Sequence, residues 1–565
     1  MTDAAAAVEA ARKALAEAEA ALAAEGSTPK TTGPLDAAGI ERIRAGYAFE
    51  GAVLEMGALV NGDALPDVQV RIPVAMLNRH GLVAGATGTG KTRTLQVLAE
   101  QLSAAGVPVF AADIKGDLSG IASPGESSDK LLARTQGIGQ HWVAAASPTE
   151  YYTLGGQGVG IPIRATVSSF GPLLLAKVLG LNATQESSLG LVFHYADRAG
   201  LPLVGLDDLR AVLSWLVSDE GKPELKSLGG LGSATAGVIL RELITFADQG
   251  ADVFFGEPEI DTQLFLRQTA EGKGIVSLLE IPGVQDKPAL FSTFLMWMLA
   301  DLFNDLPEVG DIEKPKLVFF FDEAHLLFKD ASKDFIDSIT QTVRLIRSKG
   351  VGVVFVTQTP KDVPNDVLAQ IGSRVQHQLR AHTPDDARAL KQTVSTYPTS
   401  QYDLGEVLTS LATGEAIITV MSEKGAPTPV AWTRLRAPQG SMQPTATDAM
   451  LATVNASPLM QTYGTEIDRE SAYELLSKKM NAAAEADAAR EQAEARAAED
   501  KLLAKQYEQE WKDAKAKRAP AARKTTTRTT TRRQSNPIGD ALGSRTGQTV
   551  VREVLRGIFS TLKKR

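Results

Sequence analysis

Cysteine is absent from this sequence of 565 residues. Its absence excludes disulfide bonds, thiolate metal sites and a cysteine nucleophile, and it fits a reducing compartment. The chain also lacks a run of about 18 uninterrupted apolar residues, the length that a membrane-spanning helix needs. Its N-terminus has no basic segment followed by an apolar core. We therefore predict neither a signal peptide nor a membrane span, and we expect a cytoplasmic protein.

Several kinds of catalytic motif are missing as well. We find no HExxH sequence, no His/Asp metal cluster and no nucleophile elbow. The net charge of −8 argues against a uniformly basic protein that coats DNA, although it permits a local basic surface. Hydrophobic residues make up 44% and charged residues 22%, which is ordinary for a globular chain, and the length indicates more than one structural unit.

A glycine-rich stretch fits the phosphate-loop pattern G-x-x-x-x-G-K-[ST] at every fixed position. It consists of Gly85, Ala86, Thr87, Gly88, Thr89, Gly90, Lys91 and Thr92. Residues 81–84 before it read as a short buried strand, and the helical spacing of leucines after it continues to Gly106. This context favours a nucleoside triphosphate site over a chance glycine-rich turn.

The types of residue in the loop assign its roles. Backbone N–H groups of the loop surround the phosphates, where the positive end of the following helix adds to the attraction. Lys91 is expected to contact the β- and γ-phosphates, and the Thr92 hydroxyl is expected to ligate Mg²⁺. Arg93, the next residue, is included among the predicted ATP-binding residues.

A second motif complements the loop. The most apolar run of the chain, residues 316–321, ends in Asp322-Glu323-Ala324-His325. Such a run is typical of a central strand that is covered on both faces. Asp322 is expected to hold Mg²⁺ through its water shell, and Glu323 is expected to act as general base on the attacking water. The position after an apolar strand favours ATP hydrolysis over a chance surface pair of acids.

Polar residues follow two other predicted strands, at the edge of an α/β sheet where ligands gather. Asp113 ends the strand of residues 107–112 and is followed by Ile114-Lys115-Gly116-Asp117; it lies near a ligand or is an ordinary loop carboxylate. Gln358 ends the strand of residues 351–356 and orients water or caps a loop. His325 either couples hydrolysis to movement or is a plain polar residue at a strand end, and the second interpretation is the simpler one.

Three arginines are candidates for an arginine finger, a side chain from a neighbouring subunit that stabilises charge on the transferred phosphoryl group. They are Arg344, Arg347 and Arg374. Each of them is also compatible with a surface charge.

Strands alternate with helices around the phosphate loop, which predicts an α/β fold with a doubly wound, mainly parallel sheet. Composition and periodicity divide the chain further. We predict a helical or disordered extension (1–34), a small β unit (40–75), an ATPase core in two parts (76–164 and 271–440), a helical insertion (165–270), a charged helical region (441–518), a disordered Thr/Arg linker (519–536) and a C-terminal amphipathic helix (537–565).

The phosphate loop, the segment Asp113–Asp117, the strand ending in Asp322-Glu323-Ala324-His325 and the Thr357-Gln358 strand end together resemble the HerA/FtsK group of motor ATPases. Their order and the helical insertion most resemble bacterial HerA-like proteins of the YjgR type, over about residues 40–440 and the stretch after Asn536. The resemblance implies a RecA-like core, Mg-ATP hydrolysis and a hexameric ring. It also implies that Arg374, or Arg347, contacts the nucleotide of the neighbouring subunit.

Two functions remain open at this point. The first is an ATP-driven translocase or helicase on duplex DNA, in which a basic tail contributes phosphate contacts; residues 512–533 contain nine basic side chains and one acid. The second is a nucleotide-switched assembly factor that acts on an unidentified protein partner.

Overall fold

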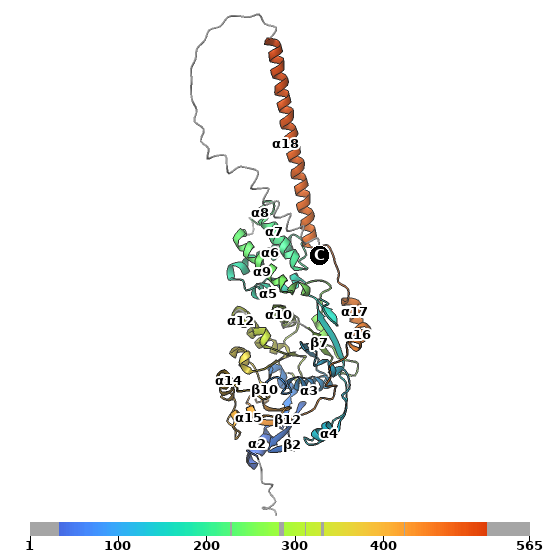
Figure 1. Cartoon of the computed structure of the whole chain (residues 1–565), viewed down its shortest axis with the longest axis vertical. Coiled ribbons are helices and arrows are strands. Elements are labelled where there is room, and N and C mark those ends of the chain that lie inside the picture. The colour runs from blue at the N-terminus through green and yellow to red at the C-terminus, as the bar shows by residue number, and fades with distance from the viewer. Residues whose placement is uncertain are drawn as a thin grey trace, which may run out of the picture. The chain divides into compact units, whose positions relative to one another are not determined.

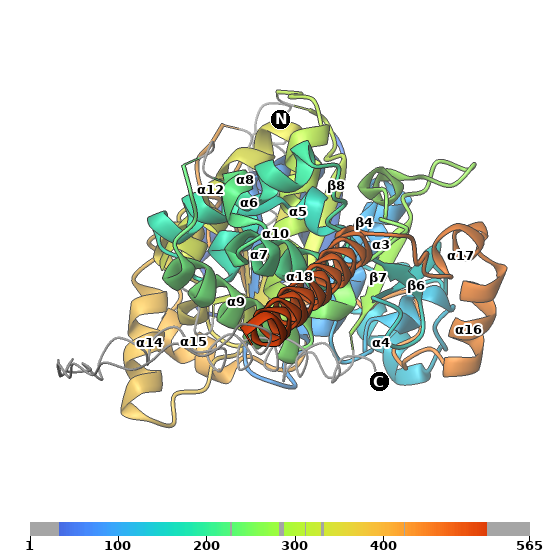
Figure 2. The same ribbon diagram turned by 90° about the horizontal axis from the view of Figure 1, so that it is seen from above.

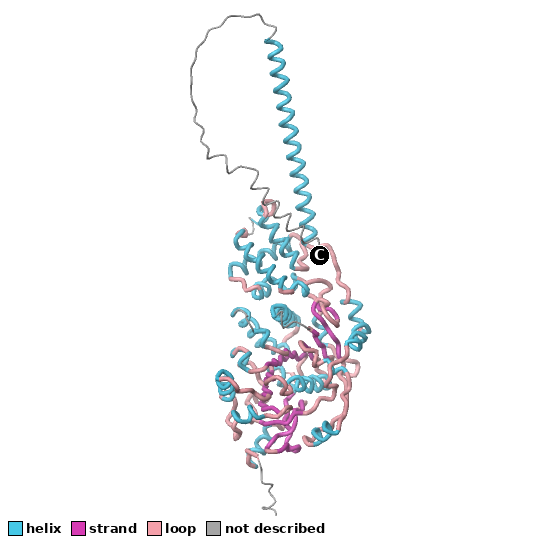
Figure 3. The backbone as a smooth tube through the Cα atoms, viewed as in Figure 1, coloured by secondary structure: helices cyan, strands magenta, loops and turns pink. Residues whose placement is uncertain are grey.

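The structure, a computed structural model, describes residues 33–225, 229–281, 288–310, 312–328, 333–422 and 424–516 (Figures 1 and 3). The predicted linker 519–536, the C-terminal amphipathic helix and nearly all of the N-terminal extension lie outside these residues. Internal contacts divide the chain into two units, residues 1–482 and 483–565. The fold of the first unit positions the candidate site and is described below.

The described strands form one sheet of twelve, in the order β2-β1-β12-β11-β10-β3-β9-β8-β4-β7-β5-β6. Its strands are β1 Val53–Asn61, β2 Asp63–Pro73, β3 Gly81–Ala84, β4 Val109–Asp113, β5 Thr149–Leu154, β6 Ile161–Ile163, β7 Val276–Glu280, β8 Leu317–Phe321, β9 Val351–Thr357, β10 Ser373–Gln376, β11 Glu415–Val420 and β12 Ala431–Leu435. Pairing is parallel from β10 to β6 and antiparallel from β2 to β10. This confirms the predicted α/β fold class, a RecA-like, doubly wound, mainly parallel sheet.

Helices connect and cover these strands. They are α2 Ala37–Gly46, α3 Lys91–Ala104, α4 Asp129–Gln136, α5 Val167–Val178, α6 Ala183–Arg198, α7 Leu206–Val217, α8 Lys222–Leu225, α9 Ser233–Asp248, α10 Pro288–Asp305, α11 His325–Phe328, α12 Lys333–Ile346, α13 Asn365–Leu368, α14 Pro384–Val394, α15 Leu404–Ser410, α16 Thr447–Ala456, α17 Pro458–Tyr463 and α18 Ala472–Ala516. Helix α17 packs against the edge strand β6 and α16 packs against β5, and Figure 2 shows both helices at this edge of the sheet.

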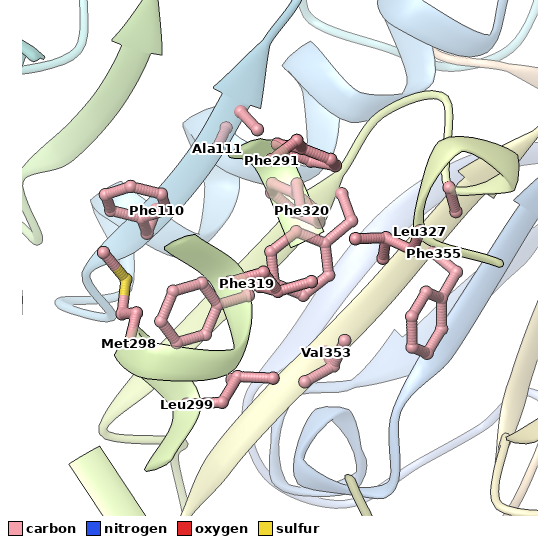
Figure 4. Close-up of a cluster of buried hydrophobic side chains, with 14 of the residues drawn as sticks. Phe110, Ala111, Phe291, Met298, Leu299, Phe319, Phe320, Leu327, Val353 and Phe355 are labelled. Atoms are coloured by element: carbon pink, nitrogen blue, oxygen red, sulfur yellow. The ribbon is translucent and has the colours of Figure 1, made fainter. Parts of the chain in front are cut away.

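The core explains why the central strands are uniformly apolar. Phe319, Phe320 and Phe321 are each at most 1% exposed although successive residues of a strand face opposite sides of the sheet. Both faces of β8 are therefore covered. Figure 4 shows side chains of β4, β8 and α10 meeting in this core. The Phe110 ring lies 5.4 Å from the Phe319 ring and 6.0 Å from that of Phe294 in α10, distances typical of favourable aromatic pairs.

The structure places the predicted small β unit in the large sheet. β1 and β2 form the expected hairpin, but β1 also pairs with β12, with Ala58 opposite Arg434. Strand β12 was not predicted, because its five residues alternate between buried and half-buried positions and carry little apolar signal. The hairpin is thus an antiparallel extension of the sheet and not a separate unit.

Helices α5 to α9 occupy the segment predicted as a helical insertion, and Figure 1 shows them gathered together. The insertion packs on the core through α10. The ring of Phe254 lies 5.8 Å from the Phe294 ring and 5.4 Å from the Trp297 ring. Among the helices of the described ranges, none is both long and apolar enough to cross a bilayer.

A buried histidine joins three segments behind the central strands. His80 is 1% exposed, and its Nδ1 accepts a hydrogen bond from the Val353 N–H at 3.1 Å. Its Nε2 must therefore carry the proton that it donates to the Val343 carbonyl, at 2.7 Å. Burial, reinforced by the charge of Arg347, lowers the pKa of His80 to about 4. The folded chain thus holds a neutral imidazole in a fixed tautomer.

We predict that His80 makes the stability sensitive to acid. Its pKa is lower in the folded chain than in the unfolded chain, so between about pH 4 and 6.5 unfolding takes up a proton and stability falls with falling pH. Replacing His80 by Asn removes this titratable group and leaves a side chain that can still donate and accept hydrogen bonds. Urea unfolding at several pH values should give a shallower dependence of unfolding free energy on pH for His80→Asn, by up to about 1.4 kcal/mol per pH unit. Parallel dependences would contradict the assignment.

Candidate active site

The phosphate loop joins β3 to α3 and is hydrogen-bonded to three other strand ends. The Gly85 N–H donates to the Thr357 carbonyl at the end of β9, at 3.2 Å. The Ala86 N–H donates to the Gln378 carbonyl after β10, at 2.8 Å. The Thr89 carbonyl accepts from the N–H of Gly414, one residue before β11, at 3.1 Å. The conformation of the loop is therefore fixed by the ends of the strands around it.

Two glycines of the loop have specific roles. Gly90 caps the N-terminus of α3 with a φ of 111°, a conformation that residues with a Cβ rarely adopt. A Cβ on Gly85 would lie only 2.4 Å from the Cβ of His377, so no larger residue fits there. The His377 ring bonds to the Thr94 hydroxyl at 2.9 Å, and burial together with the charge of Lys91 lowers its pKa to about 4. The neutral imidazole of His377 thus packs between the phosphate loop at Gly85 and the first turn of α3 at Thr94.

The remaining predicted loop residues surround an accessible backbone turn. Gly88 has a φ of 83°, and the position that a Cβ would take there is open. The Thr89 hydroxyl is bonded to the Ala86 carbonyl at 2.7 Å. Thr92 is half-buried in the first turn of α3. The Arg93 guanidinium donates to the Gln96 side chain and to the Met442 carbonyl. Arg93 therefore ties the start of α3 to the segment that follows β12.

Lys91 lies within the loop that it is predicted to serve. Its Nζ donates to the carbonyls of Gly85 at 2.7 Å and of Ala86 at 3.2 Å. Burial lowers the pKa of Lys91, against the opposing effect of the Glu323 and Asp322 carboxylates. Because hydrogen bonds from an ammonium to an anionic oxygen are stronger than those to a neutral carbonyl, a phosphate would displace these two acceptors. The loop therefore fits a nucleotide phosphate chain.

Asp322 and Glu323 follow β8 directly, at the same edge of the sheet. The Asp322 Oδ1 accepts the Glu323 N–H at 2.9 Å. Burial, followed by the negative charge of Glu323, raises the pKa of Asp322 to about 6. A bound cation would lower the pKa of Asp322 again, because a positive charge favours the ionised carboxylate.

Glu323 is the more constrained of the two acids. Its φ of 49° is uncommon for a residue with a side chain, and the residue is only 5% exposed. One carboxylate oxygen forms an ion pair with Lys115, and the other lies 3.3 Å from the Nδ1 of His325. Burial alone would raise the pKa of Glu323, but the hydrogen bond and charge of Lys115 hold it below its ordinary value. Its carboxylate is thus ionised and engaged.

Two further acids meet at the ends of β4 and β7, where Asp113 and Glu280 are opposite one another in the parallel register. The Asp113 carboxylate accepts the Leu118 N–H at 2.8 Å and so shapes the loop after β4. Burial, followed by the charge of Asp113, raises the pKa of Glu280 to about 8. Asp113 therefore has a structural task, which matches the alternative of a loop carboxylate.

The other candidates lie apart from the loop or at its margin. Gln358 is exposed directly after β9. Arg374 lies in β10, where its guanidinium donates to the Thr396 hydroxyl at 2.6 Å and faces the Tyr397 ring. Arg344 lies in the last turn of α12, and Arg347 lies in the short helix before β9. Both are therefore at the opposite ends of the parallel strands from the phosphate loop.

Three residues at the site were assigned no role from the sequence. They are Lys115, which pairs with Glu323, His377, which supports the loop, and Arg380, whose Nη2 lies 3.3 Å from the Thr87 carbonyl. Arg380 and His377 both follow β10, so their positions depend on the pairing of β10 with β3. Only a strand order, which the sequence does not display, could have indicated them.

The donor set is compatible with Mg²⁺ that is bound together with a nucleotide. Within the described ranges, no group of three or more His, Asp or Glu side chains is arranged to hold a metal alone. Mg²⁺ is commonly held by one or two carboxylates, water and substrate phosphates. The residues that would hold Mg²⁺ are Asp322, directly after β8, and Thr92, in the first turn of α3.

Comparison with known proteins agrees with this geometry. The family model described as "Helicase HerA-like C-terminal" matches residues 59–565. The chain belongs to the HerA-like helicase family. The HerA-like chain is 24% identical over 375 residues to the DNA double-strand break repair helicase HerA of Sulfurisphaera tokodaii, covering 66% of this chain and 67% of that protein.

Two other similarities accompany this match. The HerA-like chain is 23% identical over 382 residues to the corresponding helicase of Saccharolobus solfataricus, covering 67% of this chain and 68% of that protein. Among solved structures, the bacterial conjugative coupling protein TrwB is similar at 14% identity with a TM-score of 0.49, over 72% of this chain and 94% of that one.

We predict that Lys91→Ala removes tight binding of ATP. The variant loses the ammonium that lies in the loop, and a neutral methyl group cannot replace its interaction with phosphate. Binding of a fluorescent ATP analogue should weaken by about two orders of magnitude or more, as expected for a charge-assisted contact within a partly buried site. Lys130→Ala, which alters an exposed lysine of α4, is the matched control and should bind normally. Equal affinity in the two variants would contradict the assignment of the site.

Proposed function

We propose that this HerA-like protein is a Mg-ATP-hydrolysing motor that assembles into a ring, a hexamer by the family resemblance, and translocates on duplex DNA. The observation that carries the proposal is the meeting of Lys91, Asp322 and Glu323 at one edge of the sheet. Family membership supports a motor, and the names of the relatives HerA of Sulfurisphaera tokodaii and of Saccharolobus solfataricus supply DNA as the expected track.

The residues divide the work of hydrolysis. Bound Mg-ATP would supply the phosphoanhydride bond that is cleaved and the cation that neutralises its charge. The loop N–H groups and Lys91 would bind and orient the phosphate chain, while Thr92 and Asp322 would hold the cation. Glu323 removes a proton from the attacking water and keeps it on its carboxylate. Gln358, which directly follows the strand end that is bonded to Gly85, is the residue that we propose to orient that water.

In the proposed ring, the arginines act at the nucleotide site of a neighbouring subunit. Arg347 precedes β9, and the seven residues of that strand separate it from the phosphate-loop edge by about 20 Å. Such a residue cannot contact the nucleotide of its own subunit, so a catalytic role requires that it act in a neighbour. Arg374 is bonded to Thr396 and would exchange this contact for a phosphate of the adjoining subunit.

The alternative is a nucleotide-switched assembly factor that acts on protein partners. It would use the same residues for slow hydrolysis of ATP but would not need to move along DNA. The test is the rate of ATP hydrolysis with and without duplex DNA, together with the mass of the assembly in solution. A motor should form a ring-sized oligomer and hydrolyse ATP faster on DNA. A rate of hydrolysis that DNA does not change would favour the assembly factor.

We predict that Glu323→Gln separates binding from hydrolysis. The amide retains the size of the side chain but cannot accept the proton of the attacking water. Turnover should fall by about 10²- to 10⁴-fold while the affinity for Mg-ATP stays within a few fold of wild type. Measuring both quantities on the same preparation distinguishes a lost base from a disturbed fold. Normal turnover would show that Glu323 is structural.

Replacing Arg374 tests action between subunits. Arg374→Ala should lower turnover with little effect on the binding of ATP, because the altered side chain serves the neighbouring site. Mixing Arg374→Ala subunits with Glu323→Gln subunits should restore part of the activity, since some interfaces then combine an intact Arg374 with an intact Glu323. Full activity of Arg374→Ala alone would transfer the role to Arg347, and then to Arg344.

A further inference from the structure

The ion pair between Lys115 and Glu323 joins the proposed general base to a loop of the neighbouring strand. Lys115 follows β4 and Glu323 follows β8, and these two strands are parallel neighbours. The Nζ of Lys115 is within hydrogen-bonding distance of the Glu323 Oε1. The Glu323 side chain is 6% exposed, whereas that of Lys115 is 40% exposed. The pair therefore has one buried partner and one that solvent and ligands can contact.

The loop that carries Lys115 is anchored on both sides. Ile114 is 5% and Leu118 is 3% exposed, and the Leu118 N–H is bonded to the Asp113 carboxylate. Between these anchors, Gly116 adopts a φ of 73°, which permits a tight turn. The Lys115 side chain can consequently change its partner through its own rotatable bonds while the fold of the loop stays in place.

The ion pair with Lys115 opposes the proposed role of Glu323 as general base. A carboxylate oxygen that accepts a hydrogen bond from an ammonium is stabilised in its charged form and has less tendency to take a proton from water. To act as general base at that oxygen, Glu323 must give up the contact. An anion that draws the ammonium away would free the carboxylate, and a phosphate oxygen is an anion that lysine binds well.

We propose that Lys115 restrains Glu323 when the chain is free of DNA, and that a backbone phosphate of duplex DNA releases it by taking Lys115 as its own partner. This inference depends on the proposed function, because it makes Lys115 the link between the DNA track and the hydrolytic site. Lys115 is a positioning residue in this scheme: it acts on the reaction only through Glu323.

The test compares Lys115→Met and Lys115→Arg with wild type, using Lys130→Met as the control for an exposed lysine. ATP turnover is measured over a range of ATP concentrations, with and without a mixed-sequence duplex. Lys115→Met should raise the DNA-independent kcat about fivefold, the size expected for losing a partly exposed ion pair, with KM nearly unchanged. It should gain little more from DNA. Lys115→Arg retains the charge and should keep the low basal kcat.

A second measurement does not depend on turnover. Thermal unfolding of wild type, Lys115→Met, Glu323→Gln and the double variant, all without nucleotide, forms a double-mutant cycle. The two changes should be non-additive in Tm, because each removes the same ion pair. Additive shifts would show that the pair does not restrain Glu323 in solution and would overturn the proposal.

The possible outcomes separate this inference from the proposed function. An unchanged or lower basal kcat in Lys115→Met would overturn the restraint, whatever the effect of DNA. A wild-type rate that does not respond to DNA would overturn both the DNA motor and release by DNA. In that case a raised kcat in Lys115→Met together with coupling in Tm would still establish the restraint itself.

Discussion

The hydrogen bonds that attach the phosphate loop to neighbouring strand ends are the constraint on which the site depends. Strand β3 lies between β9 and β10, and the loop after it donates from Gly85 to the end of β9 and from Ala86 to the segment after β10. Parallel strands bring all their carboxyl ends to one edge. The order of strands therefore places Lys91 close to Glu323, although more than 200 residues separate them in the chain.

What the sequence predicted was local, and what it missed depends on pairing between distant segments. The phosphate loop and the acids after β8 were identified because each motif is a few adjacent residues beside an apolar strand. The Lys115–Glu323 pair spans 208 positions, and it exists only because β4 lies next to β8. The same reason explains the β1 hairpin, which looked independent because its partner β12 comes more than 370 residues later.

The arginine candidates show how position narrows a role that sequence leaves open. The sequence offered Arg344, Arg347 and Arg374 as candidates, and the family resemblance favoured Arg374 or Arg347. The strand direction now places Arg347 far from its own phosphate loop, which permits a catalytic role only toward a second subunit. Arg380, in contrast, is bonded to the Thr87 carbonyl of its own loop, so it belongs to the site within one chain.

The carboxyl groups at this edge of the sheet differ in pKa, because each has different neighbours. Glu323 is held ionised by Lys115, whereas the pKa of Glu280 is raised to about 8 by burial and by Asp113. Burial beside the Asp113 carboxylate therefore favours the protonated form of Glu280. Asp113, the last residue of β4, thus shapes the loop that carries Lys115, and Lys115 in turn holds the Glu323 carboxylate ionised.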